Sequence, residues 1–387
     1  MILMIKIIQT ICFLSFLYVM LIGNTCLYLI DEDQNKIQVE EENKSNYLEA
    51  MSQTEIGKYS FINIFGEVQK LLGRHVINDA SGQIIKLNND YLASFGWIGD
   101  TSSTIDELEK TYMELQKKGI DVLYIQARGI LSREGKELPI GIQNNDNSLL
   151  DQFIEEIKLR KIPCLDSYDI LNKNTDSWEK NFYKTDHHWI TESAFSVYAN
   201  ICEILNSDYN FKINEEYYDI NSFSKEVYKN AFLGAEGRRV GKYYAGLDDF
   251  ELIFPNFETD FTFTVPDKDI IRNGSFYNAI LDDTQILGEY GFDKNAYYKY
   301  IGGDYPFVKI ENHMQKNSRK IMVVKDSFGI PVSSFLSLAC EELSIVDVRY
   351  NEESLGSIIQ REYPDIVLFC YGGGYISYPG IVSLEKI

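Results

Sequence analysis

Proline and cysteine are scarce in this sequence, and positive charge is in the minority. The 387 residues include 8 prolines and 6 cysteines, with no tract of biased composition and no C-x-x-C pair. These features argue against a disordered chain and against a cysteine-bound metal. Lys and Arg number 37 against 58 Asp and Glu, so the formal net charge is −21. Because such a surface repels phosphate backbones, we expect no nucleic-acid partner.

The cysteines are spread through apolar stretches rather than gathered in a motif. They are Cys12 and Cys26 near the N-terminus, and Cys164, Cys202, Cys340 and Cys370 further along. An apolar setting is typical of buried structural thiols, so we expect free cysteines. Disulfide pairing stays open as an alternative for a protein outside the cell.

A long uncharged segment stands at the N-terminus. Residues 7–30 carry no charged side chain, Lys6 precedes them, and acidic residues follow directly. At about 1.5 Å per residue this run can cross a bilayer as a helix, and its flanking charges favour an outward body. We expect a signal-anchor transmembrane helix at 1–30, an acidic stalk at 31–57 and an extracytoplasmic domain at 58–387. A cleaved signal peptide is the alternative, although its apolar region is usually shorter.

Beyond the stalk, stretches with apolar residues at helical spacing alternate with short continuous apolar runs. The expected helices are residues 102–118, 148–161, 191–205, 331–340 and 354–360. The expected strands are residues 59–65, 83–87, 121–127, 162–165, 320–325, 343–348 and 365–370. Strands that alternate with helices are typical of βαβ units. The sequence therefore predicts an α/β fold in which a mainly parallel sheet lies between two helical layers.

Residues 207–305 interrupt this alternation. They are rich in Tyr, Asp and Asn, and they contain strand-like pieces at 250–254 and 261–265. A stretch of this length is too long for a simple loop. We expect an inserted β-rich subdomain that separates the two chemical motifs in sequence.

Histidine, the usual general base at neutral pH, occurs at four positions only. Two of them, His187 and His188, belong to the run Thr185-Asp186-His187-His188-Trp189. In an extended loop, residues two apart point the same way, so Asp186 can hold one nitrogen of His188. The other nitrogen is then free to accept a proton.

A candidate nucleophile follows the expected strand 320–325. Ser327 lies in Lys325-Asp326-Ser327-Phe328-Gly329, where the strand gives way to a helix. Sites in parallel sheets form beyond the carboxyl ends of strands, and backbone amides at such a turn can receive an oxyanion. The alternative interpretation is that Ser327 only caps the helix.

Both motifs resemble those of a known family. The run 185–189 resembles the signature of the DHHW family, which is similar to the SGNH-hydrolase-like alginate O-acetyltransferases, and residues 324–329 resemble their nucleophile block. Residues 233–234, 237–239 and 300–304 also resemble blocks of DHHW proteins. The resemblance extends over about residues 60–375. It implies an SGNH-hydrolase-like three-layer α/β/α fold.

Residue by residue, the resemblance implies a catalytic triad. Ser327 would be the nucleophile, His188 the base and Asp186 the carboxylate that orients it, with His187 as the alternative base. Similar proteins place an oxyanion donor after a late strand, where SGNH enzymes have Asn, but here the sequence has none. The candidate oxyanion or substrate groups are Tyr371, Gly372, Gly373, the Ser327 amide, Arg239 and His187.

The resemblance implies O-acetylation of an extracellular or cell-wall polysaccharide through an acyl-serine intermediate, with no cofactor. A multi-spanning membrane acyltransferase would supply the acyl group. A glycan O-acetyl esterase is the closest alternative, because sequence does not reveal the acceptor. A non-catalytic glycan-binding or assembly subunit is another. A metal-dependent phosphoesterase is a third, since Asp-His-His can bind a metal.

Overall fold

The computed structural model describes residues 55–94, 98–173, 177–285, 292 and 294–385. The expected transmembrane helix and nearly all of the expected stalk lie outside these ranges. Within them, no helix combines the length and apolar character needed to span a bilayer. The chain divides into two compact units, one of residues 1–73 with 240–244 and one of residues 74–239 with 245–387.

The described part of the smaller unit contains helix α3 (Glu55–Leu71). A strand at 59–65 is therefore wrong. The short window is mostly apolar, but Phe61, Phe65 and Val68 recur at helical spacing once the whole segment is considered. The amide of Lys242 donates to the Asn63 side chain at 2.8 Å, which ties residues 240–244 to this helix.

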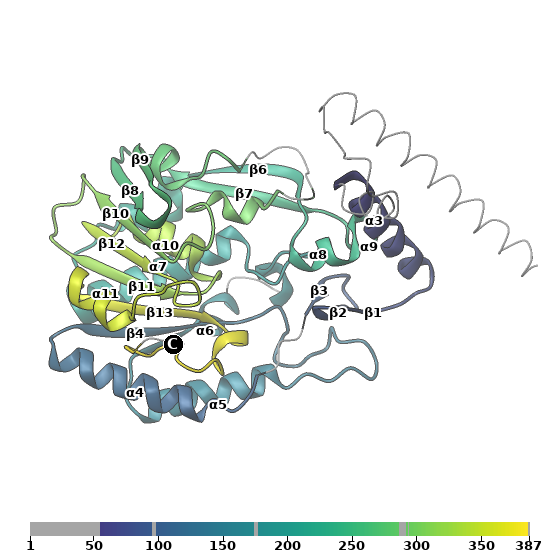
Figure 1. The fold of residues 1–387 in the computed structure, drawn as a ribbon, viewed down its shortest axis with the longest axis horizontal. Helices are drawn as coiled ribbons and strands as arrows, with labels where there is room; N and C mark the ends of the chain where they lie inside the picture. Colours follow the sequence, from purple (N-terminus) through teal and green to yellow (C-terminus); the bar gives the residue numbers. More distant parts are fainter. Residues whose placement is uncertain (1–54, 95–97, 174–176, 286–291, 293, 386–387) are drawn as a thin grey trace, which may run out of the picture. The chain divides into compact units, whose positions relative to one another are not determined.

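The larger unit is built on an eight-stranded mixed sheet in the order β5-β4-β13-β11-β12-β10-β8-β9 (Figure 1). The first five strands are parallel, and the last three run antiparallel to their neighbours. The predicted mainly parallel α/β sheet is thus confirmed. The strands are β4 (Asp121–Ala127), β5 (Cys164–Asp166), β8 (Phe261–Val265), β9 (Ile270–Gly274), β10 (Phe307–Asn312), β11 (Lys320–Lys325), β12 (Glu342–Val346) and β13 (Ile366–Gly372).

Helices cover both faces of this sheet. Strand side chains alternate between faces, so Leu123 and Ile125 of β4 join one core while Val122 and Tyr124 join the other. The first core includes α6 (Ser167–Leu171), α7 (Thr191–Tyr209) and α10 (Gly329–Leu336). The second includes α4 (Ser102–Lys117), α5 (Asp146–Leu159) and α11 (Leu355–Glu362). This is the expected three-layer α/β/α arrangement.

The region 207–305 does not behave as one piece. The strands β6 (Phe223–Phe232) and β7 (Asp248–Pro255) form a separate two-stranded sheet, whereas β8 and β9 extend the central sheet. The alternating pattern of residues 261–265 predicts a strand, but it does not indicate which strand this one pairs with. The helices α8 (Ala235–Val240) and α9 (Lys242–Ala245) follow β6.

The remaining elements are short. A three-stranded sheet contains β1 (Val76–Asp79), β2 (Gly82–Lys86) and β3 (Leu92–Ala93). Single-turn helices lie at η2 (Trp178–Asn181), η3 (Glu215–Tyr217), η4 (Ile220–Ser222), η5 (Pro266–Lys268), η6 (Phe276–Ile280), η7 (Ala296–Lys299) and η8 (Gly373–Tyr375). The four cysteines in the described ranges are free thiols, as expected, and Cys164 alone among them is partly exposed.

Candidate active site

The run Thr185–Trp189 forms a closed loop at the start of α7. Phe182 and Trp189 pair across its base, and the amide of Tyr183 donates to the carbonyl of His188 at 3.1 Å. Trp189 is fully buried and packs edge-on against Phe328, with ring centroids 5.3 Å apart. Trp189 is therefore a packing residue, and it packs the loop against the segment after β11.

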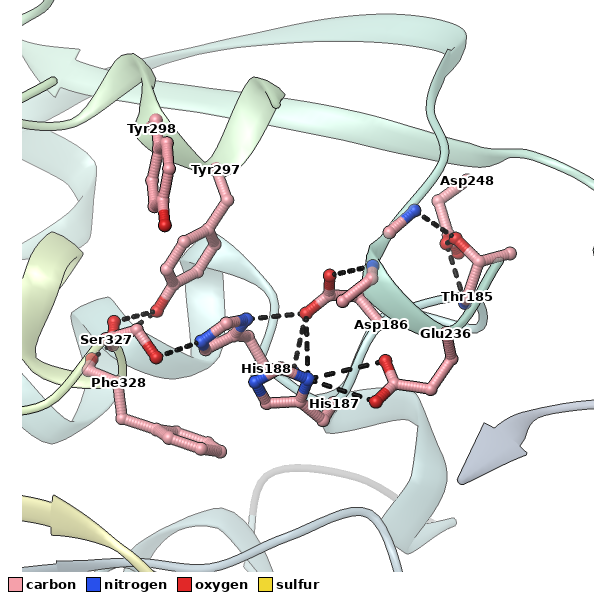
Figure 2. A network of polar contacts seen from close by, with 12 residues as sticks. Thr185, Asp186, His187, His188, Glu236, Asp248, Tyr297, Tyr298, Ser327 and Phe328 are labelled. Carbon is pink, nitrogen blue, oxygen red and sulfur yellow. Dashed lines mark hydrogen bonds and ion pairs between the residues drawn. The ribbon is translucent and has the colours of Figure 1, made fainter. Parts of the chain in front are cut away.

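The loop brings Asp186, His188 and Ser327 into a continuous chain of hydrogen bonds (Figure 2). The Oδ1 atom of Asp186 lies 2.5 Å from Nδ1 of His188, and Nε2 of His188 lies 2.7 Å from Oγ of Ser327. Asp186 and His188 are buried, and Ser327 is half-buried. The geometry is that of an orienting carboxylate, a base and a nucleophile. It joins residues that are 139 positions apart.

Ser327 does not cap the helix that follows it. The N-cap residue of α10 is Phe328, and no side chain accepts a hydrogen bond from the first amides of this helix. The neighbouring carboxylate of Asp326 instead accepts the amides of Phe328 at 2.9 Å and Gly372 at 2.7 Å. Burial raises the pKa of Asp326 to about 6. These bonds fix the nucleophile turn against the carboxyl end of β13.

Tyr297 of η7 supports both the base and the nucleophile. Its ring stacks on His188, with centroids 4.2 Å apart and an angle of 20° between the planes. Its hydroxyl donates to the carbonyl of Ser327 at 3.0 Å. Sequence reasoning missed this residue, because its position in a Tyr-rich stretch gives no local signal.

His187 makes a second imidazole–carboxylate pair. Its Nδ1 lies 3.2 Å and 3.3 Å from the two carboxylate oxygens of Glu236, and Ser94 donates its hydroxyl to Glu236 at 2.6 Å. Burial disfavours the charged imidazole, but the carboxylates of Glu236 and Asp186 outweigh it and raise the pKa of His187 to about 9. His187 does not contact Ser327 among the hydrogen bonds of the described residues, so the geometry favours His188 as the base.

Asp248 fixes the start of the loop through hydrogen bonds. Its carboxylate accepts the amide of Lys184 and both the amide and the hydroxyl of Thr185, at 2.6 Å to 2.8 Å. Gly234 lies on the same side, where an added Cβ would overlap Asp186 and stand 2.5 Å from the Thr185 carbonyl oxygen. The amide of Ala235 donates to Oδ2 of Asp186 at 2.7 Å. Asp186 is therefore fixed on both of its oxygens.

The triad opens onto a cavity of about 720 Å³. Its lining includes Ser327, His187, Gly373 and Arg239. Arg239 donates from Nε and Nη2 to the two carboxylate oxygens of Asp79, at 2.7 Å and 2.6 Å, so this ion pair fixes the side chain at the wall of the cavity.

The sequence-predicted oxyanion candidates separate into two kinds. Tyr371 is buried and donates its hydroxyl to the Ile381 carbonyl at 2.7 Å, so its side chain serves the core. The amide of Gly372 is already bound by Asp326. The amide of Ser327 takes part in none of the turn and loop hydrogen bonds found among the described residues. The Ser327 amide is therefore the candidate that the geometry leaves available.

Asp186, His187 and His188 also place potential metal ligands within 4.8 Å of one another. However, the Asp186 and His188 ligand atoms are only 2.5 Å apart, which is the distance of a shared proton. Two ligands of a tetrahedral zinc ion stand about 3.3 Å apart, given bond lengths of about 2.0–2.1 Å. The observed arrangement fits a triad better than a metal centre.

Comparison with known proteins bears on this geometry. Residues 99–227 match the family model described as the SGNH hydrolase-like domain of the acetyltransferase AlgX. The chain carries an SGNH hydrolase-like acetyltransferase domain. The matched segment contains Asp186 and His188, and it ends before Ser327. No curated protein matches the chain in sequence.

Two solved structures share the fold of this domain over most of the chain. A DHHW family protein from Eubacterium siraeum is 18% identical, with a TM-score of 0.61 over 80% of this chain and 97% of its own. Bacillus cereus PatB1, solved with a sulfonyl adduct, is 18% identical, with a TM-score of 0.62 over 80% of this chain and 100% of its own. The resemblance to DHHW and SGNH-hydrolase-like proteins is thereby confirmed at the level of the fold.

Proposed function

We propose that this chain is an exported, membrane-anchored serine acyltransferase that O-acetylates a polysaccharide. The observation that carries the proposal is the hydrogen-bonded chain from Asp186 through His188 to Ser327, at 2.5 Å and 2.7 Å. The acetyltransferase domain over residues 99–227 supports the choice of reaction.

The reaction proceeds in two steps of the same kind. His188 takes the proton of Ser327 while Oγ attacks the acyl carbonyl, and the protonated His188 then gives that proton to the leaving group. In the second step His188 takes a proton from an acceptor hydroxyl, whose oxygen attacks the acyl-serine. The ester bond to Ser327 breaks, and Oγ recovers its proton from His188. Asp186 stabilises the imidazolium in both steps.

The oxyanion of each tetrahedral intermediate needs hydrogen-bond donors beside Ser327. The Ser327 amide supplies one of them in this proposal, because Ser327 lines the cavity and its amide takes part in none of the turn and loop hydrogen bonds of the described residues. The bonds that Asp326 accepts from Phe328 and Gly372 fix the segment that carries Ser327 against the end of β13.

A polysaccharide acceptor suits the aromatic side of the cavity. Tyr375 and Tyr378 line it, with ring centroids 5.6 Å apart, and Tyr378 is 59% exposed. Arg349 donates to the hydroxyl of Tyr375 at 2.9 Å and holds that ring in place. Exposed rings of this kind present an apolar face on which a sugar ring can rest.

The acyl donor and the cellular location are part of the same proposal. Residues 7–30 anchor the chain, and the catalytic domain lies outside the cytoplasmic membrane. A multi-spanning membrane acyltransferase supplies the acyl group. The uncharged run and its flanking charges support the anchor.

The test is acetate release from p-nitrophenyl acetate by the full-length chain in detergent, followed by addition of oligosaccharide acceptors. Ser327→Ala and His188→Ala should each lower turnover on the order of 10⁴-fold or more. Ser207→Ala and His75→Ala, which alter exposed side chains, are the matched controls. Turnover by Ser327→Ala equal to that of the unaltered chain would refute the acyl-serine. Acetate release that acceptors leave unchanged would mark an esterase.

The metal-dependent alternative is tested in the same assay. A chelator should leave turnover unchanged, and a serine-directed organophosphonate should label Ser327 and abolish turnover. Loss of activity in chelator, restored by added zinc, would instead support the phosphoesterase interpretation.

A further inference from the structure

The two adjacent histidines of the loop are each paired with a carboxylate of their own. His188 is paired with Asp186, and His187 is paired with Glu236 (Figure 2). Glu236 comes from α8, 49 residues away, and its side chain is buried with Ser94 as its further partner. A carboxylate buried in this way requires a nearby positive charge or several donors. His187 is the group that supplies the charge.

His187 keeps that charge close to the base. The ring centroids of His187 and His188 are 4.0 Å apart, with 37° between the planes. His187 lines the cavity with its side chain 41% exposed, and its Nε2 atom has no hydrogen-bond partner among the described residues. A like charge at this distance disfavours protonation of the neighbouring ring.

The other groups that face His188 shift its pKa in opposite directions. Burial is the strongest influence and lowers its pKa, and the His187 imidazolium lowers it further. The carboxylates of Asp186 and Glu236 raise it. Asp326 acts on the pair through His187, whose pKa it raises. The stacked ring of Tyr297 carries no charge, because burial raises the pKa of its hydroxyl well above the ordinary value. The net result is a lowered pKa for His188.

We propose that His187, held as an imidazolium by Glu236, is a positioning charge that keeps His188 in its neutral, proton-accepting form. The proposal rests on the assignment of His188 as the base in the proposed acyl transfer. A base that holds its proton weakly also passes it readily to the leaving group. His187 thereby acts in both halves of each step through its effect on His188.

The charge can be removed in two ways that have different consequences. In His187→Gln the positive charge is lost while Glu236 remains, so His188 should become easier to protonate. In the double variant His187→Gln with Glu236→Gln, both charges are lost and the net charge beside His188 is unchanged. If the role of His187 is electrostatic, the double variant should restore the pKa of His188 that His187→Gln alters.

The experiment is an NMR titration of the full-length chain carrying ¹³C at the histidine Cε1 atoms. The chain has four histidines, so substitution of His75 and His313 leaves the signals of His187 and His188, and His187→Gln tells these two apart. The His188 midpoint should rise by about one pH unit in His187→Gln and return to within about 0.3 in the double variant. In Glu236→Gln, the His187 midpoint should fall from about 9 toward the ordinary imidazole value.

The same variants are compared in pH–rate profiles of kcat/KM for p-nitrophenyl acetate. The acidic limb of His187→Gln should move to higher pH with the His188 midpoint, while the alkaline plateau stays within about threefold. A His188 midpoint that is the same in the unaltered chain and in His187→Gln would overturn the proposal. The titration does not need turnover. An inactive chain would therefore refute the proposed function, while the effect of His187 on the pKa of His188 could still be measured.

Discussion

The hydroxyl of Tyr297 donates to the carbonyl of Ser327, while the ring of the same residue lies flat on the imidazole of His188. One side chain thus fixes the distance between the base and the nucleophile. Tyr297 is fully buried and comes from η7, 30 residues before Ser327, so its position is set by the fold rather than by either motif. This relationship implies that the two functions of the ring can be separated by substitution.

Tyr297→Phe should keep the stacking and lose the hydrogen bond. A net hydrogen bond contributes about 1 kcal/mol, which corresponds to a fall of about fivefold in kcat. Tyr297→Ala should lose the stacking as well, and a base that is misplaced by about 1 Å can cost about 10²-fold. The measurement is kcat for p-nitrophenyl acetate. Tyr298→Phe is the matched control, because its hydroxyl contacts Asp304 and not the triad. Equal losses in Tyr297→Phe and Tyr297→Ala would contradict the separation.

Asp186→Asn should lower kcat by about 10⁴-fold, the loss found when a triad carboxylate becomes an amide. One oxygen of Asp186 faces His188 and the other accepts the amide of Ala235. Asn has a single oxygen, so it must abandon one of these partners or present its NH₂ group to the imidazole. Thermal unfolding of the variant, followed by circular dichroism, checks that the fold survives. A loss below about tenfold would mean that His188 needs no orienting carboxylate.

The pKa of Asp186 also decides which group limits activity in acid. Burial opposes the ionised carboxylate, but the imidazoles of His188 and His187 outweigh this and hold its pKa well below the usual range. A depressed folded pKa gives stability above the unfolded value of 3.8, which is lost only as pH falls through the folded value. Asp186 therefore stays ionised through mildly acidic pH. The acidic limb of kcat/KM should report protonation of His188.

Asp248→Ala should destabilise the loop that carries Asp186 and His188. The substitution removes the acceptor of three hydrogen bonds from Lys184 and Thr185, and each buried donor left unpaired costs about 1–3 kcal/mol. We expect kcat to fall about 10–10²-fold with little change in KM, as measured with p-nitrophenyl acetate. The adjacent Asp249 provides the control, because its ion pair with Lys229 is exposed and contributes about 1 kcal/mol or less. Equal effects of Asp248→Ala and Asp249→Ala would contradict the loop-holding role.

The pH dependence of stability offers a second measure of Asp248. Burial outweighs the three hydrogen bonds and raises its pKa to about 6, above the unfolded value of 3.8. As pH falls, the Asp248 carboxylate is therefore protonated at a higher pH in the folded state than in the unfolded state. The contribution of Asp248 to the free energy of unfolding should rise as pH falls from about 6 toward about 4, and urea titrations should lose this component in Asp248→Ala.

The triad could be predicted from the sequence because its parts have local signals. Asp186 and His188 are two residues apart, and Ser327 comes two residues after a strand with a continuous apolar run. Each signal needs only a few neighbouring residues. The fold then brings the two motifs together, because Ser327 lies beyond the carboxyl end of β11 and the loop before α7 reaches it there.

The supporting residues could not be predicted in this way. Tyr297 reaches Ser327, Glu236 reaches His187 and Asp248 reaches Lys184 across 30 to 64 positions, and nothing beside these residues in sequence marks the partner. Tyr371 shows the opposite case. It shares a strand face with Val367 and Phe369, which belong to the core beneath α4 and α5, so the alternation along β13 already directs its side chain away from the site.

Tyr378→Ala should weaken the use of glycan acceptors and spare the chemistry of small esters. The ring lies at the cavity that contains Ser327, and it takes no part in the triad or its supports. Aromatic contacts of this kind contribute about 0.5–1.5 kcal/mol, so KM for an oligosaccharide acceptor should rise about 2–10-fold. Turnover of p-nitrophenyl acetate without acceptor should stay within about twofold. Tyr378→Phe should behave as the unaltered chain, because a sugar rests on the ring face rather than on the hydroxyl. Tyr363→Ala, which removes a 65% exposed ring that is not among the residues lining this cavity, is the control. An acceptor KM that is equal in Tyr378→Ala and Tyr363→Ala would show that the acceptor does not use this ring.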